Sequence, residues 1–302
     1  MSAVHTGTHE QRRLFRWSVV VAVLAALTVA LCYVVFVRTH WGQEVDDLAF
    51  EGRAAVKPAA TKRLDAMLRT VTEFSLFLLG GAIVLLALAQ RRLRLVFVVG
   101  AAMSFAVVTT EVLKLWLLTR PSFTGVEGIT HNSYPSGHAT IGMVLSLGLV
   151  MVSTSRTRRV ATVAAAVLST MFGTAVLATG WHRPSDSVGA AAVALAWFAA
   201  GNAALVWSDV HRPYRRGAAG PDDRPPSRAL LGGAVAALLA FSIVVLVRTL
   251  EDHGLRTVAY AGRYVVATIV IDLVGIATVL LFAVLTGRRA RTRRDALAAA
   301  PG

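Results

Sequence analysis

The chain has 302 residues, of which 55% are hydrophobic and only 16% are charged. A soluble protein carries about a quarter charged residues, and here the apolar excess falls in runs of about 20 residues, long enough to cross a ~30 Å hydrocarbon layer as a helix. The formal net charge of +14 comes from short basic clusters between these runs, which fits membrane topology and argues against a nucleic-acid partner.

The apolar runs predict an all-α fold, a polytopic membrane helix bundle. The first run follows several arginines, as in a signal peptide, but it is too long for a signal sequence and no small-residue cleavage site follows it. It is therefore expected to be a retained first helix. The eight expected helices cover residues 18–37, 72–90, 93–118, 137–154, 160–180, 187–207, 229–247 and 264–286.

A segment rich in Arg, Pro, Gly and Asp joins the sixth and seventh expected helices and is typical of a linker. It divides a six-helix phosphatase-like core from two additional transmembrane helices. The expected organisation is a cytoplasmic N-terminal segment (1–17), the core (18–207), a cytoplasmic linker (208–228), the two added helices (229–287) and a basic cytoplasmic tail (288–302).

The arginines predict the orientation of the bundle. Most of them lie in the N-terminal segment, after the second and fourth helices, in the linker and in the tail, whereas the long loop 39–71 balances its basic residues with acidic ones. The positive-inside rule then predicts a multi-pass cell-membrane protein with both termini in the cytoplasm. The loops after the third and fifth helices become extracytoplasmic.

The first of these two loops carries groups suited to a phosphate ester. Lys114 ends the third helix and supplies a point charge, and Arg120 offers two donors to two oxygens. Ser136 is expected to cap the fourth helix, where Gly137 lets an anion approach the free amides at the positive helix end. His138 follows and is placed to protonate a leaving alkoxide.

The second loop carries a histidine and a carboxylate. His182 and Asp186 stand four residues apart around Pro184, at the start of the sixth helix. A carboxylate that is hydrogen-bonded to one ring nitrogen fixes the tautomer and leaves the other nitrogen to attack phosphorus. The two loops together predict a phosphoryl-transfer site.

These motifs resemble those of the type 2 phosphatidic acid phosphatase family, the membrane relatives of vanadium haloperoxidases and bacterial acid phosphatases. The resemblance covers the six-helix core and rests on Pro135-Ser136-Gly137-His138 and His182-Arg183-Pro184-Ser185-Asp186, in the family's order. It implies a metal-independent hydrolase without a cofactor. It also implies that His182 forms a phosphohistidine, that Asp186 orients it, that His138 is the acid, and that Lys114, Arg120, Ser136 and Gly137 bind phosphate.

The sequence departs from the family pattern at two places. Lys114 and Arg120 stand six residues apart, where the family has seven. The arginine that the family places six residues before the nucleophilic histidine is Val176 here. Loss of one such donor costs about 10²–10³ in rate. We take Arg183, next to His182, as the hypothetical substitute phosphate-binding residue.

Several of these residue types also have ordinary structural roles. Glu111 stands three residues before Lys114 and is expected to pair with it on one helix face. Trp116 and Trp181 suit an aromatic belt, and Trp181 also suits a headgroup pocket. His131 and His253 are interpreted as satisfied interfacial polar residues.

The predicted function is hydrolysis of a mono- or diphosphate ester on a membrane lipid, such as polyprenyl diphosphate, phosphatidate or phosphatidylglycerophosphate, through a phosphohistidine at the extracytoplasmic face. The expected partners are this lipid and the bilayer. The alternative is a weak or inactive family member that binds or moves a phospholipid or serves as a membrane interaction partner. A metal-dependent hydrolase is a third and poorer interpretation.

Overall fold

The structure is a computed structural model that describes residues 2–70, 73–125, 132–211 and 255–298. Helices dominate these residues, and none of them lies in a strand. The helices are α1 (Ser2–Cys32), continued by η1 (Tyr33–Val37), α2 (His40–Glu51), η2 (Gly52–Ala55), α3 (Pro58–Thr70), α4 (Glu73–Ala89), α5 (Leu93–Val112), continued by η3 (Leu113–Leu117), α6 (Gly137–Val152), α7 (Arg158–Ala178), α8 (Pro184–His211) and α10 (Leu255–Ala298).

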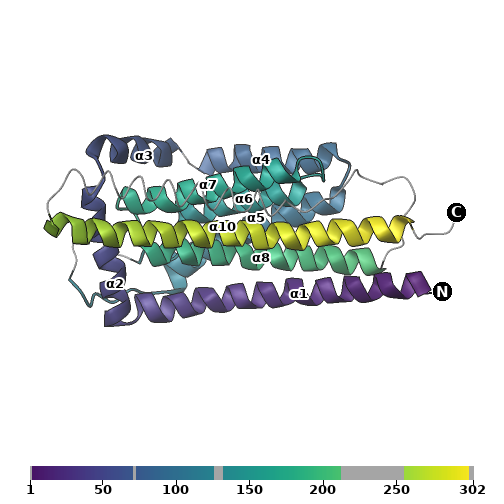
Figure 1. Ribbon diagram of the computed structural model, residues 1–302, viewed down its shortest axis with the longest axis horizontal. Coiled ribbons are helices and arrows are strands. Elements are labelled where there is room, and N and C mark those ends of the chain that lie inside the picture. The colour runs from purple at the N-terminus through teal and green to yellow at the C-terminus, as the bar shows by residue number, and fades with distance from the viewer. Residues whose placement is uncertain (1, 71–72, 126–131, 212–254, 299–302) are drawn as a thin grey trace.

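The long helices lie side by side along one axis, and the start of α1 and the end of α10 lie at the same end of the bundle (Figure 1). The short helices α2 and α3 lie at the opposite end. Helix α8 ends beside the chain termini, whereas α10 begins at the far end, so these two helices run parallel. The helix that the sequence predicts at 229–247 lies outside the described residues.

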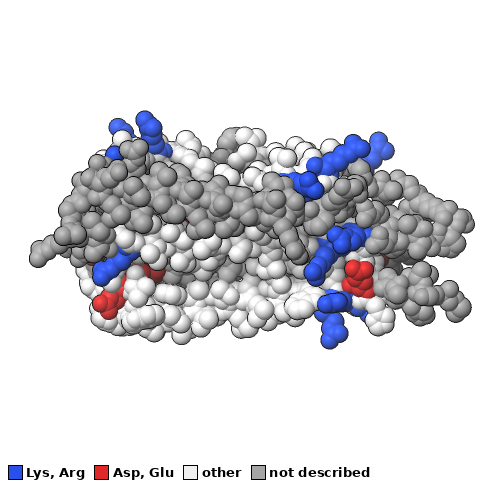
Figure 2. Space-filling view, viewed as in Figure 1, with Lys and Arg blue, Asp and Glu red and all other residues white. Residues whose placement is uncertain are grey.

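The outer surface of the bundle suits a bilayer. Large apolar side chains are exposed along the helices, such as Leu27 and Leu31 on α1, Leu85 on α4 and Phe97 on α5. On the face in Figure 2, the charged residues among those described gather toward the two ends, and the described residues visible in the middle are uncharged. Among the described residues, five helices are long and apolar enough to cross a membrane, namely those at His9–Val37, Leu93–Leu117, Arg158–Ala178, Pro184–Asp209 and Ala261–Thr292. The predicted all-α membrane bundle is confirmed.

Helix α10 shares the core of the helices that precede it. Its buried Ile276, Val279 and Phe282 belong to one apolar cluster with residues of α5, α6 and α8, and the ring of Phe282 packs edge-on against Phe198 of α8. Helix α10 also contacts α7, where Thr174 Oγ1 donates a hydrogen bond of 2.8 Å to an Asp272 carboxylate oxygen. The described part of the predicted C-terminal addition is therefore packed into the bundle.

The segment 39–71 differs from the loop that the sequence suggested. It forms α2, η2 and α3, with Thr39 as the cap of α2, because its side chain accepts a hydrogen bond from the Gly42 amide at 3.0 Å. Helix α2 folds back tightly on η1, since a Cβ atom at Gly42 would lie 1.9 Å from the Val35 carbonyl oxygen. These helices cover the end of the bundle that holds the candidate site.

Candidate active site

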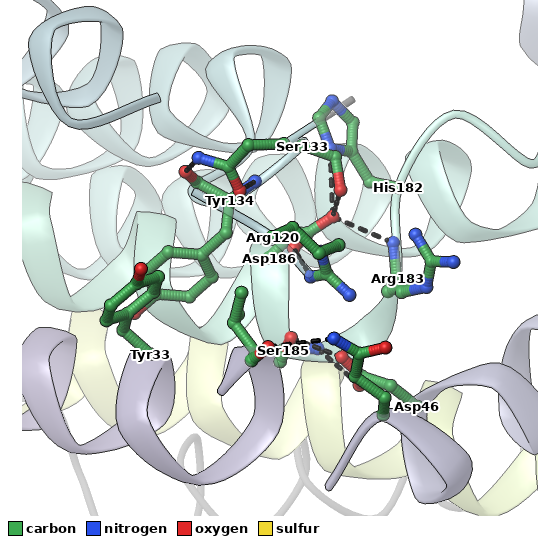
Figure 3. Close-up of polar contacts among 12 residues, drawn as sticks. Tyr33, Asp46, Arg120, Ser133, Tyr134, His182, Arg183, Ser185 and Asp186 are labelled. Carbon is green, nitrogen blue, oxygen red and sulfur yellow. Dashed lines mark hydrogen bonds and ion pairs between the residues drawn. The ribbon is translucent and has the colours of Figure 1, made fainter. Parts of the chain in front are cut away.

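The predicted site residues meet at one end of the bundle. Four segments supply them: the end of η3 with the chain after it, the start of α6, the end of α7 and the start of α8. Figure 3 shows Arg120, Ser133 and His182 turned toward Asp186 from three of these segments. The structure therefore brings together two loops that lie about 60 residues apart in the sequence.

Asp186 is the centre of the site. Its side chain is fully buried and accepts four hydrogen bonds. His182 Nδ1 lies 3.2 Å from Oδ2, which also accepts from Ser133 Oγ at 2.6 Å and from the Arg183 amide at 3.0 Å. Arg120 Nη2 donates to Oδ1 at 3.1 Å. A carboxylate with this many donors stays charged and keeps a fixed orientation.

The start of α8 explains why Asp186 is held so firmly. Pro184 occupies the first helical position, where its missing N–H costs nothing and its fixed φ suits the helix. Asp186 lies in the first turn and accepts from the Arg183 amide just ahead of the helix, as the acidic residue of a capping box does. The carboxylate that faces His182 Nδ1 is thus fixed by the helix that it caps.

His182 reaches Asp186 from a tight turn at the end of α7. The amides of Trp181 and His182 both donate to the Val176 carbonyl, at 3.0 and 3.1 Å. Gly180 has a φ of +74°, which favours glycine, and a Cβ atom there would lie 2.5 Å from Arg53 Nε. Since Nδ1 of His182 faces Asp186, Nε2 is the ring nitrogen left for chemistry.

Arg120 has the properties of an anion ligand. Its side chain is 5% exposed, and its Nε and Nη1 atoms are buried without a hydrogen-bond partner among the described residues. Unpaired buried donors on a cation are costly, so the geometry favours an anion beside them. The chain becomes extended at Leu118, directly after the π-helical turn η3. Arg120 therefore lies beyond the helix end, so its position relative to Lys114 is not set by helical periodicity.

Lys114 lies in η3, and its side chain extends to the start of α6. Its Nζ pairs with Glu111 Oε1 at 2.7 Å, as the sequence suggested. A Cβ atom at Gly137 would lie 2.9 Å from that Glu111 oxygen and 3.5 Å from Lys114 Nζ. Glycine at this position therefore makes room for the ion pair beside the helix end.

Ser136 caps α6, because its Oγ accepts from the Ala139 amide at 3.2 Å. The Ser136 amide donates to the backbone carbonyl of Asp186 at 3.1 Å, which ties the start of α6 to the start of α8. His138 is the second residue of α6, and its ring packs edge-on against Trp181. The two predicted histidines thus belong to segments that are joined by backbone and ring contacts.

The position of the missing family arginine is apolar. Val176 is fully buried and packs in a cluster with Leu68 of α3 and Ala139 of α6. Arg183 contacts α2. Its Nε pairs with Asp47 of α2, its guanidinium carbon lies 5.5 Å from the centroid of the Phe50 ring, and its Nη1 is buried without a partner among the described residues.

Sequence reasoning missed the acidic residues that α2 supplies. Asp46 accepts from the Ser185 amide at 3.0 Å and from the Ser185 hydroxyl. Burial raises the pKa of Asp46 to about 7, and the nearby charge of Asp186 adds to the shift. The signal was the spacing of Gln43, Asp46 and Asp47, which puts all three side chains on one face of a helix.

Residues 93–210 match the family model of the PAP2 superfamily. This segment runs from the start of α5 to the end of α8 and contains every predicted site residue, so the resemblance to type 2 phosphatidic acid phosphatases is confirmed. The superfamily implies phosphatase activity on phosphate esters. No curated protein and no solved structure matches the chain.

Proposed function

Since residues 93–210 belong to the PAP2 superfamily, we propose that this protein is a metal-independent lipid phosphatase. Its substrate is a mono- or diphosphate ester at the head of a membrane lipid, and its reaction passes through a phosphohistidine. The observation that carries the proposal is the contact between His182 Nδ1 and Asp186 Oδ2 at 3.2 Å, beside the buried unpaired donors of Arg120.

In the first step, His182 Nε2 attacks phosphorus. The N–P bond forms as the P–O bond to the lipid breaks, and His138 gives its proton to the leaving oxygen. Asp186 stabilises the positive charge that develops on His182, while Arg120 and Lys114 hold the non-bridging phosphate oxygens.

In the second step, water hydrolyses the phosphohistidine. His138, now neutral, takes a proton from the water as its oxygen attacks phosphorus, and the N–P bond breaks. Inorganic phosphate leaves, and His182 and His138 return to their starting states. The amide end of α6 and Arg120 bind the phosphate throughout both steps.

A lipid substrate is supported by the surroundings of the site. Trp116 of η3 is 82% exposed and Trp41 of α2 is 63% exposed, beside outward-facing leucines at 115 and 117. Exposed tryptophans of this kind lie at the membrane–water interface. An ester at that depth is presented by a lipid headgroup. The basic clusters at the opposite end support an extracytoplasmic site with both termini in the cytoplasm.

The test is phosphate release by purified protein in detergent from a panel of lipid mono- and diphosphates, in excess EDTA. The wild type, His182→Ala and the control His40→Ala are compared, because His40 is an exposed histidine of α2. We expect release by the wild type and by His40→Ala, and none by His182→Ala. Asp186→Asn is expected to accumulate less acid-labile phosphoenzyme than the wild type.

Two outcomes would overturn the proposal. Equal release by His182→Ala would place the chemistry elsewhere. The absence of release from every lipid, with the wild type folded and still binding those lipids, would favour a lipid-binding protein. The apolar surroundings of Val176 give that second candidate its support, because the site lacks a cation there.

A further inference from the structure

Helix α2 lies outside the segment that matches the family model, yet it contacts both loops of the site. Its contacts come from three side chains, Gln43, Asp46 and Asp47, which we call the α2 polar face. The three residues are only 2–3% exposed to solvent, although two of them are acidic. Buried acidic residues are rare unless they are paired, so their partners indicate their role.

We propose that the α2 polar face positions the reacting groups of the site, so that Gln43, Asp46 and Asp47 are positioning residues of this phosphatase. The proposal rests on the proposed function for its catalytic consequence. It adds an element that neither the motifs nor the matched segment contains.

The first contact fixes the start of α8. Asp46 Oδ1 accepts from the Ser185 amide at 3.0 Å, and its Oδ2 accepts from the Ser185 hydroxyl (Figure 3). The Ser185 amide belongs to the first turn of α8 and has no partner within its own helix. Asp46 therefore satisfies a helix-end donor one residue before Asp186, and it restrains the turn that aims Asp186 at His182.

The second contact fixes Arg183. Asp47 Oδ1 pairs with Arg183 Nε, and both side chains are about 5% exposed. The Arg183 amide is one of the donors to Asp186 Oδ2. Asp47 thus fixes the side chain of Arg183, and the backbone amide of Arg183 in turn fixes the Asp186 carboxylate. It also supplies a counter-charge to the buried guanidinium group of Arg183.

The third contact reaches the loop that carries Arg120. Gln43 Nε2 donates to the Pro121 carbonyl at 2.6 Å, and Gln43 Oε1 accepts from the Phe123 amide at 3.2 Å. Thr124 Oγ1 donates to Asp47 Oδ2 at 2.5 Å. The same helix face thereby fixes the chain just after Arg120 and the chain on both sides of Pro184.

These contacts join elements that the sequence alone leaves independent. Arg120 and Asp186 must stay within hydrogen-bond distance for the site to hold its geometry, and they come from two separate loops. A displacement of about 1 Å in a reacting group costs as much as 10²-fold in rate. Removal of the α2 polar face is therefore expected to reduce kcat more than it changes KM.

The experiment compares Asp46→Ala, Asp46→Asn and Asp47→Asn with the control Glu44→Gln in the full chain. Glu44 is also an acidic residue of α2, but its side chain is 56% exposed. Steady-state release of phosphate is measured with the lipid phosphate that the wild type hydrolyses best. Hydrogen exchange is measured in parallel on peptides that cover 119–124 and 182–187.

We expect kcat to fall about tenfold or more in Asp46→Ala and Asp47→Asn, with KM changed by less than about threefold. Exchange is expected to rise at 182–187 in Asp46→Ala, because the Ser185 amide has lost its acceptor. It is expected to rise in both peptides in Asp47→Asn, because the side chains of Arg183 and Thr124 have lost their charged partner. Asp46→Asn keeps one acceptor oxygen and is expected to retain more activity than Asp46→Ala. Glu44→Gln is expected to match the wild type in both measurements.

Unchanged exchange at 182–187 in both Asp46→Ala and Asp47→Asn would overturn the proposal, whether or not the protein hydrolyses lipids. Wild-type kcat in these variants, alongside inactive His182→Ala, would overturn it while the proposed function stands. If the wild type itself releases no phosphate, the exchange result alone decides whether the α2 polar face holds the two loops. Asp46→Asn serves as the folded variant if Asp46→Ala does not fold.

Discussion

The indole ring of Trp181 meets the imidazole ring of His138 edge-on, with the ring centroids 5.0 Å apart. Trp181 is itself held by α3, because its Nε1 donates to Asp65 Oδ1 at 3.1 Å. Arg69 completes the group, with its Nε 2.7 Å from Asp65 Oδ2 and its guanidinium carbon 5.3 Å from the Trp181 ring centroid. The hydrogen bond from Arg69 holds the pKa of Asp65 below its usual value. A chain of contacts thus leads from the surface of α3 to the proposed general acid.

Loss of the Trp181 ring should therefore impair proton transfer by His138. We expect Trp181→Ala to lower kcat about tenfold, because the imidazole loses the surface that orients it. Trp181→Phe keeps a ring and is expected to stay within about threefold of the wild type. Steady-state phosphate release measures both effects, and equal kcat values for Trp181→Ala and the wild type would contradict this role.

Arg120 should dominate phosphate binding. It presents two buried donors that have no partner in the described part of the chain, and it also donates to Asp186. Its replacement therefore removes both the proposed anion ligand and a partner of the Asp186 carboxylate. We expect Arg120→Gln to lower kcat/KM by about 10²–10³. Arg120→Lys should recover only a small part, since an ammonium group lacks the fork that serves two oxygens.

The matched control for this prediction is Arg63→Gln. Arg63 is an exposed arginine of α3 at the same end of the bundle. The same change in net charge there should leave kcat/KM within about twofold of the wild type. A similar loss in both variants would mean that general charge attraction, and not a contact of Arg120, explains the effect.

Much of the fold follows from the sequence, because a run of about 20 apolar residues has few alternatives to a membrane-crossing helix. The run 93–118 matches α5 with η3, and 160–180 lies close to α7 (Arg158–Ala178). The segment 39–71 was different. Its helices α2 and α3 are short and carry charged residues, so hydropathy gives no signal for them.

The sequence predicts those parts of the site in which the interacting residues are close to each other along the chain. His182 and Asp186 are four residues apart and meet within one helix start. The contacts of Asp46 with Ser185 join residues 139 positions apart, and no local pattern predicts such a pairing. In the sequence, the carboxylates of α2 appear only to balance the basic residues of the segment 39–71. Their burial depends on tertiary contacts, which the sequence does not show.

Asp46 should make the stability of the protein depend on pH. Its pKa is raised from 3.8 to about 7, chiefly by burial and also by the facing carboxylate of Asp186. The hydrogen bonds from Ser185 and the guanidinium group of Arg120 oppose this shift. The folded state therefore binds this proton more tightly than the unfolded chain does. The stability that the proton contributes is fully present below about pH 4 and is lost as the pH rises to about 7.

Asp46→Asn keeps a neutral group at this position at every pH. We expect the difference in thermal midpoint between Asp46→Asn and the wild type to increase from about pH 4 to about pH 7 and then to level off. In this window the free energy of unfolding of the wild type falls by at most about 1.4 kcal/mol per pH unit relative to that of the variant. Thermal unfolding of both proteins in detergent, in one buffer series, measures it. A constant difference across the series would mean that Asp46 does not titrate in this range.

The contact between α7 and α10 should be sensitive to one added methyl group. A Cβ atom at Gly173 of α7 would lie 2.6 Å from Ile271 Cγ2 of α10, next to the hydrogen bond between Thr174 and Asp272. Ile271 is buried in a cluster with Leu177, so its branched side chain has little room to move. Gly173→Ala should therefore push the two helices apart and lower the stability by about 1–3 kcal/mol.

Gly100 of α5 is the matched control, because a Cβ atom there would have no neighbour within 4 Å. Gly100→Ala should leave the thermal midpoint unchanged or raise it slightly, since alanine is favoured over glycine within a helix by about 1 kcal/mol. The two variants differ only in where the methyl group is added, so thermal unfolding separates packing from helix propensity. His182 follows the end of α7, and α10 lies outside the matched segment. If Gly173→Ala lowers both the thermal midpoint and the phosphatase activity, packing of α10 against α7 supports the site. A thermal midpoint equal to that of Gly100→Ala would contradict this prediction. It would mean that α10 shifts to make room for the methyl group and that the position of α7 does not depend on this contact.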